Sequence, residues 1–244
     1  MIARSAQAAQ YVAIDVPGAF GVRLPLGIWT CDDESFTLLF QEWGQRTARL
    51  AHVPDGTQVS CIGPLGNVFE LPQWGERATI VAGGLGIVPF WLLARDLRRA
   101  GVPTTIILGA RSKPLLVGTQ QLETYAHDLQ ICTDDGSAGF RGNVLQRLEQ
   151  LHDPGVIYGC GPPGMLRSLC QQAEERGLEC QVSLEENFAC SLGTCWGCVV
   201  PVRRGCAQGT NYPRAAGEPR DHDLARVCSD GTVFRAADLR WPRR

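Results

Sequence analysis

The stretch Ala78-Thr-Ile-Val-Ala-Gly-Gly-Leu-Gly-Ile-Val-Pro89 joins an apolar strand to a helical pattern through a glycine-rich turn. Glycines at positions 83, 84 and 86 allow the backbone to approach a pyrophosphate closely. The helix that follows offers unpaired N–H groups and a favourable dipole to the same anion. The stretch predicts a parallel-sheet unit with a nucleotide-binding turn, although glycine turns also occur between strands and helices without any ligand.

Strands and helices alternate from residue 73 to residue 182. The predicted strands cover 78–82, 104–108, 129–133, 156–158 and 178–182, and the predicted helices cover 87–100, 144–151 and 163–176. Continuous apolar strands separated by helices favour a doubly wound parallel sheet that is covered on both faces. A second glycine-rich turn at Cys160-Gly-Pro162 ends another strand, and ligands bind beyond the carboxyl ends of such strands. We therefore predict an α/β nucleotide-binding domain over residues 73–182.

Residues 1–72 have a different pattern, with short apolar strands and frequent turns. The predicted strands cover 11–16, 35–40 and 57–62, and Pro-Gly, Pro-Asp-Gly and Gly-Pro steps separate them. This spacing favours a small antiparallel β-barrel, with a fragment of a β-sandwich as the alternative. The turn Gly63-Pro-Leu-Gly66-Asn67 is either a plain interdomain turn or a wall of a flavin pocket where the two domains meet.

Residues 183–244 carry a cysteine pattern, Cys190-x4-Cys195-x2-Cys198. This is the plant-type ferredoxin spacing for three of the four thiolates of a 2Fe–2S cluster. Glycine at position 193 suits a chain that must loop tightly around such a group. The alternatives are a zinc knuckle, which usually pairs two short cysteine hooks, and core thiols that bind no metal.

The fourth thiolate must come from further along the chain, where Cys206 and Cys228 are the candidates. Cys228 lies in a short apolar run that ends in a turn, whereas Cys206 lies in a polar, glycine-rich stretch. We therefore favour Cys228. Residues 201–224 are rich in Arg, Gly, Pro and Asp, and they are predicted to form a solvated loop.

Composition limits the possible functions. The chain has 244 residues, of which 44% are hydrophobic and 20% charged, so it can bury a substantial core in one to three domains. Its net charge of −2 argues against a nucleic-acid binder. The longest apolar stretch is too short and too broken by glycine and proline to span a membrane. No catalytic triad or carboxylate pair stands out, so no catalytic side chain is predicted.

The eleven cysteines do not form the pattern of a disulfide framework, because their number is odd and the chain is long. The first residues also lack the apolar core of a signal peptide. These features predict a cytoplasmic protein whose thiols stay reduced and serve a metal.

With barrel, nucleotide-binding sheet and cysteine segment in that order, the chain resembles the ferredoxin–NADP reductase superfamily. Within it, the chain is most similar to the electron-transfer subunits of class 1B dihydroorotate dehydrogenases. The resemblance covers nearly the whole chain. Its most specific motifs are Gly63–Asn67, Gly83–Gly86, Cys160–Pro162, Ser183–Cys190 and Arg226–Phe234.

The resemblance implies an α/β plus β fold of three parts, with a flavin-binding barrel over 1–72, an NAD-binding domain over 73–182 and a 2Fe–2S domain over 183–244. It also implies a role: hydride from NADH reaches FAD, and single electrons pass through the cluster to FMN on a separate dihydroorotate dehydrogenase catalytic subunit of pyrimidine biosynthesis, in a heterotetramer. Two alternatives are a similar reductase subunit that serves another oxidoreductase, and a partner protein that has lost flavin binding.

The resemblance also assigns residues. The implied iron ligands are Cys190, Cys195, Cys198 and Cys228. The residues implied to face nicotinamide and flavin are Gly83, Gly84, Gly86, Cys160, Gly161 and Pro162. Those implied to bind FAD from the barrel are Arg23, Pro25, Gly27, Gly44, Thr47, Gly63, Gly66 and Asn67.

The chain departs from the flavin motifs of this family at two places. The family has an Arg-Pro-x-Ser type motif, but here Leu24 stands where its arginine is expected and Gly27 where its serine is expected. A following Gly-x-Gly-Thr motif appears as Gly44-Gln-Arg-Thr47. Arg23 or Arg46 is the candidate for the missing cation, because a guanidinium can pair with phosphate from a neighbouring position. The alternative is that flavin binding is weak or lost.

Overall fold

The computed structural model describes residues 2–206 and 222–241, which fall into two compact units. The first unit comprises Met1–Val68, Glu185–Thr232 and Asp238–Arg244. The second unit comprises Phe69–Leu184 and Val233–Ala237. A separate domain for residues 183–244 stays a prediction, and the two units are described one at a time below.

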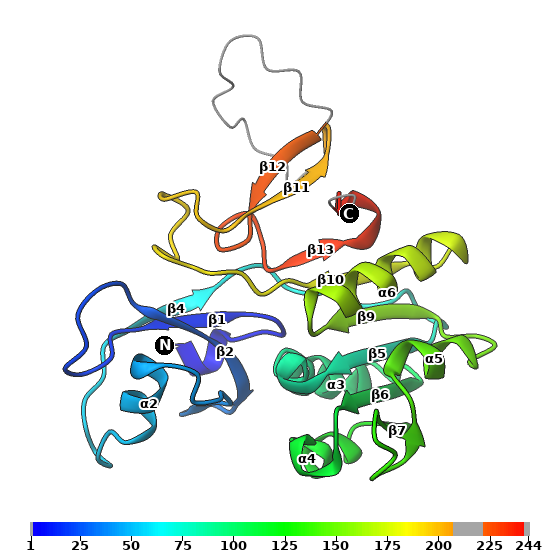
Figure 1. The fold of residues 1–244 in the computed structure, drawn as a ribbon, viewed down its shortest axis with the longest axis horizontal. Coiled ribbons are helices and arrows are strands. Elements are labelled where there is room, and N and C mark those ends of the chain that lie inside the picture. The colour runs from blue at the N-terminus through cyan, green and yellow to red at the C-terminus, as the bar shows by residue number, and fades with distance from the viewer. Residues whose placement is uncertain (1, 207–221, 242–244) are drawn as a thin grey trace. The chain divides into compact units, whose positions relative to one another are not determined.

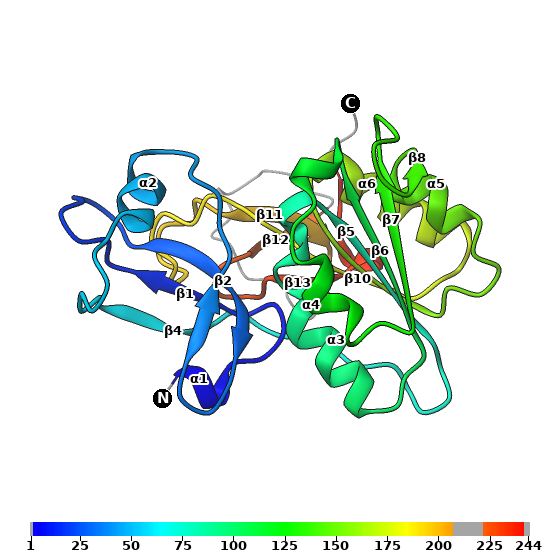
Figure 2. The same ribbon diagram turned by 90° about the horizontal axis from the view of Figure 1, so that it is seen from below.

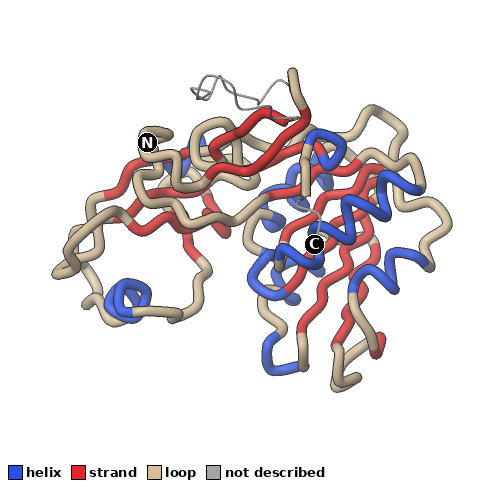
Figure 3. Tube along the Cα trace, turned by 45° about the horizontal axis from the view of Figure 1, so that its top comes forward, coloured by secondary structure: helices blue, strands red, loops and turns tan. Residues whose placement is uncertain are grey.

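The described part of the second unit forms a seven-stranded sheet in the order β13-β10-β9-β5-β6-β7-β8. Figure 3 draws the strands in red. The strands of this sheet are β5 (Ala78–Gly83), β6 (Thr104–Ala110), β7 (Asp128–Thr133), β8 (Phe140–Arg141), β9 (Val156–Cys160), β10 (Cys180–Ser183) and β13 (Val233–Arg235). Neighbouring strands are parallel except for β10 and β13, which are antiparallel. The chain starts in the middle of the sheet at β5, winds outward through β6 and β7 to β8, and then returns to β9 on the other side of β5. That reversal makes β5 and β9 the switch point of the sheet.

Helices cover both faces of this sheet: α3 and α4 lie on one face, and α5 and α6 lie on the other (Figure 2). Their bounds are α3 Phe90–Arg99, α4 Thr119–Glu123, α5 Val144–Glu149 and α6 Pro163–Glu175, with 3-10 turns η1 Gly84–Ile87, η2 Lys113–Leu115 and η3 Ala236–Asp238. The predicted doubly wound parallel sheet is confirmed. Sequence patterns missed α4, and they placed the start of α3 at residue 87, where the structure has the end of η1.

Aromatic side chains fill the core where the chain enters the second unit. The ring of Phe69 lies 5.6 Å from the ring of Phe90 and 5.4 Å from the ring of Tyr158, centroid to centroid. The Tyr158 hydroxyl donates to the carbonyl oxygen of Glu70 at 2.8 Å, and burial of this phenol raises its pKa. The Gln181 amide forms two further hydrogen bonds with the Glu70 backbone, at 2.9 and 3.0 Å. These contacts fix the segment that leads into β5.

The first unit contains a four-stranded antiparallel sheet in the order β3-β2-β1-β4 (Figure 1). Its elements are α1 (Ile2–Ser5), β1 (Tyr11–Ile14), β2 (Leu24–Cys31), β3 (Phe36–Leu38), α2 (Gln45–Ala51) and β4 (Cys61–Leu65). The predicted antiparallel β architecture of the N-terminal part is thereby confirmed. The strand predicted over 57–62 begins only at Cys61.

Strand β2 was not predicted, because Pro25 and Gly27 lower the strand propensity of its first half. The structure shows why proline is tolerated there. Pro25 lies opposite Ala13 of β1, whereas β3 pairs with β2 only from Ile28 onward. At Pro25 the strand has a neighbour on one side, so the missing N–H can face away from the ladder.

The predicted solvated loop over residues 201–224 is partly wrong. The structure has an antiparallel hairpin of β11 (Val199–Arg203) and β12 (His222–Arg226), with Val199 opposite Arg226. The remainder of the predicted loop, 207–221, lies outside the described residues. The two strands bury little more than Val202 and Ala225, and Pro201 and Asp223 lower their strand propensity, so this part of the sequence resembles a loop.

Two findings concern the described residues as a whole. None of the eleven cysteines, all of which lie within these residues, forms a disulfide. No helix over 2–206 or 222–241 is long and apolar enough to cross a membrane.

The aromatic core of the second unit gives a first prediction. Phe90 is fully buried, so a Phe90→Ala substitution removes a large side chain from a packed core and leaves a cavity. We expect the free energy of unfolding to fall by about 3–5 kcal/mol in chemical denaturation. Trp74→Ala is the control, because Trp74 is 98% exposed and its loss should change stability by less than about 0.5 kcal/mol. Equal losses in the two variants would contradict the assigned core.

Candidate functional site

The two glycine-rich turns of the second unit lie together at the switch point of its sheet. Residues Ala82 and Cys160 are paired across β5 and β9, so the turns that follow leave the same edge side by side. A Cβ on Gly86 would lie 2.3 Å from the carbonyl oxygen of Cys160, and a Cβ on Gly83 would lie 2.9 Å from Cδ of Pro162. Any larger residue at position 86 would therefore push the turns apart.

This arrangement has the chemistry of a nucleotide phosphate site. Helix α6 begins directly after the second turn, with Pro163 in its first position, and η1 and α3 follow the first turn. Backbone N–H groups at a helix start attract anions, and glycine lets a phosphate come close. Gly83, Gly84, Gly86, Cys160, Gly161 and Pro162 are thus brought together as predicted, while their ligand stays a prediction.

In the first unit, the predicted cluster cysteines lie on one loop and one turn, and backbone N–H groups point at three of their sulfur atoms. The sulfur of Cys190 accepts from the backbone N–H groups of Leu192 and Cys195, both at 3.4 Å. The sulfur of Cys195 accepts from Gly197, and that of Cys198 accepts from Cys228, each at 3.4 Å. Hydrogen bonds of this kind stabilise thiolate charge.

Backbone-to-sulfur hydrogen bonds join the four cysteines in two pairs, Cys190 with Cys195 and Cys198 with Cys228, and Cys190 also acts electrostatically on Cys228. Within the parts of the chain that the structure describes, no three His, Cys, Asp or Glu side chains converge on a position for a single metal ion. A 2Fe–2S cluster spreads its four thiolates over two irons. The paired arrangement therefore fits a two-iron cluster better than it fits one tetrahedral zinc ion.

Two of these thiols have shifted pKa values of opposite sign. Burial opposes ionisation of Cys190, but hydrogen bonds from Thr194, Leu192 and Cys195 outweigh it and lower the pKa to about 5. Burial and the neighbouring Cys198 thiol raise the pKa of Cys228 to about 12. Cys190 is thus ready to bind a cation as a thiolate, whereas Cys228 would release its proton on metal binding.

The structure also distinguishes between the two candidates for the fourth ligand. Cys228 follows β12, its backbone N–H bonds to the Cys198 sulfur, and Val227 donates to the Cys198 carbonyl oxygen at 3.0 Å. Cys206 lies in the turn after β11, where its N–H donates to Arg203. The geometry supports the prediction of Cys228.

Tyr11 of β1 is a residue of this site that sequence patterns missed. Its buried hydroxyl lies 3.1 Å from the carbonyl oxygen of Ser191 and 3.0 Å from that of Cys228. Its ring packs on Phe188, with 5.0 Å between centroids. The Tyr11 hydroxyl thus links the cysteine loop to the turn that carries Cys228. These residues are far apart in the sequence, so no local sequence pattern could predict the contact.

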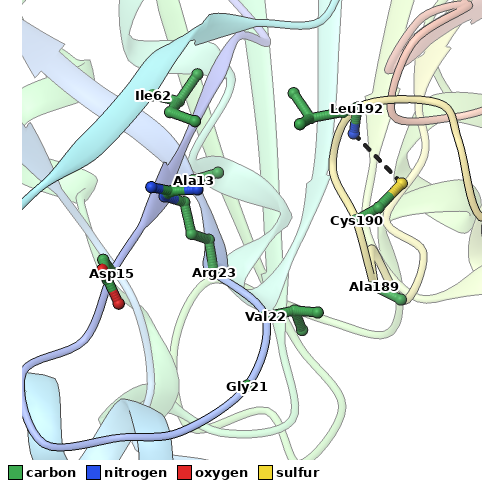
Figure 4. A pocket seen from close by; sticks show the side chains of 9 residues that line it. All are labelled: Ala13, Asp15, Gly21, Val22, Arg23, Ile62, Ala189, Cys190 and Leu192. Carbon is green, nitrogen blue, oxygen red and sulfur yellow. Dashed lines mark hydrogen bonds between the residues drawn. The ribbon is translucent and has the colours of Figure 1, made fainter.

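A cavity of about 220 Å³ lies between β1, the start of β2 and the cysteine loop (Figure 4). Arg23 reaches toward Ala13 on one side of this cavity, and Cys190 and Leu192 lie on the other side. The Nε atom of Arg23 is buried and has no hydrogen-bond partner among the described residues. A buried guanidinium N–H without a partner favours an anionic ligand.

The second candidate for the missing flavin cation is Arg46, which lies in α2. Its guanidinium donates to the carbonyl oxygen of Val22 on an exposed surface. Of the two arginines, Arg23 is therefore the one with an unsatisfied donor beside a cavity.

The structure gives the other predicted flavin residues packing or turn roles, and none of them lines the Arg23 cavity. Pro25 and Gly27 pair with β1. Gly44 and Thr47 begin α2, where the Thr47 hydroxyl accepts from the N–H groups of Trp43 and Gly44 at 2.9 and 3.0 Å. The remaining three are Gly63, which packs closely on Val12, and Gly66 and Asn67, which lie against Thr232.

Similar curated proteins share one description. The chain is 32% identical over 231 residues to the electron-transfer subunit of dihydroorotate dehydrogenase B (NAD⁺) from Caldanaerobacter subterraneus subsp. tengcongensis, covering 94% of this chain and 85% of that protein. It is 33% identical over 240 residues to the subunit of the same name from Bacillus caldolyticus, covering 96% and 86%. The chain belongs to this family of electron-transfer subunits. No family model matches the sequence.

Solved structures extend this assignment of family to the fold. The NADH-dependent reduced ferredoxin–NADP oxidoreductase superposes with a TM-score of 0.81 at 26% identity, over 98% of this chain and 82% of that chain. The flavohaemoglobin-like FAD/NAD-binding domain of nitric oxide dioxygenase from Vibrio cholerae has a TM-score of 0.61 at 20% identity, over 72% and 85%. The predicted ferredoxin–NADP reductase-like fold is confirmed.

The contact between the two glycine turns gives a second prediction. Gly86→Ala places a Cβ against the backbone of Cys160 and Gly161, so we expect a loss of roughly 1–3 kcal/mol in unfolding free energy. The measurement is chemical denaturation followed by circular dichroism. Gly164→Ala is the matched control, because nothing lies within 4 Å of its added Cβ in the first turn of α6. A Gly86→Ala variant as stable as Gly164→Ala would show that the turns do not touch.

Proposed function

We propose that this chain carries electrons between NAD⁺/NADH and the FMN of a dihydroorotate dehydrogenase catalytic subunit, through FAD and a 2Fe–2S cluster, in pyrimidine biosynthesis. Oxidation of dihydroorotate to orotate releases two electrons, so in that reaction they run from the FMN to NAD⁺, and NADH feeds the same path in reverse. The observation that carries the proposal is the hydrogen-bonded arrangement of Cys190 with Cys195 and of Cys198 with Cys228 in a member of this family. A heterotetramer with the catalytic subunit, in the cytoplasm, belongs to the same proposal.

The proposed order of groups follows from how many electrons each one handles. Nicotinamide delivers two electrons as hydride and a 2Fe–2S cluster accepts one at a time, whereas a flavin does both when bound. The chain's own part is to bind and position these groups. The glycine turns after β5 and β9 would hold the nicotinamide nucleotide at the sheet edge, and the backbone N–H groups around the thiols would set the charge on the sulfurs.

Two observations support the cofactors separately. The unsatisfied Nε of Arg23 fits an anionic group such as a flavin phosphate, despite the leucine at position 24. The N–H groups directed at cysteine sulfur fit thiolates that carry iron. The residues present therefore fit both groups.

A second candidate function keeps the cofactors and changes the electron acceptor. The structural likeness to a ferredoxin–NADP oxidoreductase, at a TM-score of 0.81, favours a reductase subunit that serves another oxidoreductase. One experiment distinguishes the two functions. The purified chain is combined with an FMN-containing catalytic subunit, dihydroorotate and NAD⁺, and NAD⁺-dependent formation of orotate and NADH is measured.

The deciding measurement is the flavin and iron content of the purified chain, alone and with that catalytic subunit. The proposal expects about one FAD and two irons per chain, with NADH-dependent bleaching of both absorption bands. Iron without flavin, even after reconstitution with FAD, would contradict the proposal and favour a partner protein that has lost the flavin.

The choice of the fourth ligand gives a third prediction. Cys228→Ser should abolish the cluster, since one thiolate of the Cys198 pair is lost, while any bound flavin remains. Iron analysis and the visible spectrum measure the loss. Cys206→Ser is the matched control, and it should keep a full complement of iron. Normal iron in Cys228→Ser together with loss in Cys206→Ser would reverse the assignment.

The unpartnered Nε atom of Arg23 gives a fourth prediction. Arg23→Gln removes a charge-assisted hydrogen bond, typically about 1.5–3 kcal/mol, so the dissociation constant for FAD should rise roughly 10- to 100-fold. Titration of the flavin-depleted chain with FAD, followed by fluorescence, measures it. Arg46→Gln is the control, because the Arg46 guanidinium already donates to Val22. A larger loss of affinity in Arg46→Gln would assign the cation to α2 instead.

A further inference from the structure

Arg226 ends strand β12, two residues before Cys228, and its side chain reaches back to the cysteine loop. Its Nη1 donates to the carbonyl oxygen of Gly193 at 2.7 Å. Gly193 lies between Cys190 and Cys195, with a φ of +76°. A Cβ at this position would lie 2.6 Å from the Ser229 hydroxyl, so the loop and the turn after β12 are in close contact here.

The same guanidinium contacts the second half of the loop through an aromatic ring. The Arg226 side chain lies over the indole of Trp196, 4.5 Å from the ring centroid. Trp196 stands between Cys195 and Cys198 and has a φ of +58°, which is costly for a residue with a Cβ. Stacking on the guanidinium is a contact that helps to maintain this conformation.

Asp230 fixes the guanidinium in place. Its two carboxylate oxygens accept from Arg226 Nη2 at 2.9 Å and from Nε at 3.1 Å, and one of them also accepts from the Arg226 backbone N–H at 2.7 Å. The Arg226 and Asp230 side chains are only 24% and 11% exposed. A bidentate arginine–carboxylate ion pair that is mostly buried has one preferred geometry, and a lysine side chain cannot reproduce it.

We propose that Arg226 is a positioning residue for the cluster. It holds both halves of the Cys190–Cys198 loop against the turn that carries Cys228, and it places a permanent positive charge beside them. The inference rests on the proposed function, because it concerns a cluster bound by these four thiols. It goes beyond that function by assigning a role to a residue that is not a ligand.

The two parts of this role, position and charge, are separable by substitution. Arg226→Lys keeps the charge but loses the planar fork to Gly193 and Asp230. Arg226→Gln loses both and leaves the Asp230 carboxylate uncompensated. A double variant, Arg226→Gln with Asp230→Asn, removes both charges and leaves the fork broken. Arg235→Gln is the matched control, since Arg235 forms an exposed ion pair with Glu70 in the second unit.

The experiment compares iron release to a chelator and the reduction potential of the cluster, followed by electron paramagnetic resonance, in the full chain. Residues that support metal ligands typically contribute 10- to 100-fold to metal affinity. We expect Arg226→Lys and Arg226→Gln to release iron at least about tenfold faster than the wild type. The reduction potential of the cluster should fall in Arg226→Gln, because the unpaired Asp230 carboxylate disfavours addition of an electron to the cluster. In the double variant, the reduction potential should move back toward the wild-type value.

Wild-type rates of iron release in Arg226→Lys and Arg226→Gln would overturn the positioning role, and an unchanged potential in Arg226→Gln would overturn the role of the charge. Arg226→Lys keeps the charge and the long stem, so it carries the test of position if Arg226→Gln fails to fold. Faster iron release in Arg235→Gln would also count against the inference. A wild-type chain without any 2Fe–2S signal would overturn the proposed function itself, which is a different failure.

Discussion

The first unit depends on bringing two chain segments together, the loop of Cys190–Cys198 and the turn of Cys228. Backbone bonds do part of this, because Val227 donates to the Cys198 carbonyl and the Cys228 N–H points at the Cys198 sulfur. The Tyr11 hydroxyl lies between carbonyl groups of both segments, so strand β1 contributes to the same junction. Like-charged thiolates repel one another, and the fold has to hold them together before a metal compensates for that repulsion. The cysteine segment and the N-terminal sheet fall within the same compact unit.

The second unit depends on a different constraint, the close packing of two turns at the point where the sheet reverses its winding. Strands β5 and β9 are neighbours although β6, β7 and β8 separate them in sequence. Gly86 allows the backbone of the first turn to meet that of Cys160, which leaves the starts of η1 and α6 at one sheet edge. An anion at this edge would meet N–H groups from two helical turns, which is how open α/β sheets bind nucleotides.

Sequence patterns predicted those parts of the fold that local physics determines. Strands such as β5 are buried along almost their whole length, so they appear as continuous apolar runs, and the thiol spacing of the cysteine loop is a local property of the chain. Strand β2 and the β11–β12 hairpin escaped prediction, because they contain residues of low strand propensity that form strands only through their partners. Examples are Pro25 and Gly27 in β2 and Pro201 and Asp223 in the hairpin. The contacts of Tyr11 and Arg226 also join residues far apart in sequence, and only the folded chain shows them. Arg23 could be predicted only in part. The sequence shows its positive charge, but only the structure shows that its Nε atom is buried without a hydrogen-bond partner.

The chain departs from the family's flavin motif in two ways. Leucine replaces the arginine expected at position 24, and the nearest arginine is at position 23. Neighbouring residues in extended backbone point to opposite sides, so Arg23 does not occupy the place that an arginine at position 24 would take. It lies instead at the cavity that Cys190 and Leu192 also line. An anionic group bound to Arg23 would therefore be held next to the cysteine loop, within a single unit of the chain. The spacing of the thiols does not depend on the residue at position 23 or 24, so the proposed flavin site and the proposed cluster site would be separate, and a loss of one would not entail a loss of the other.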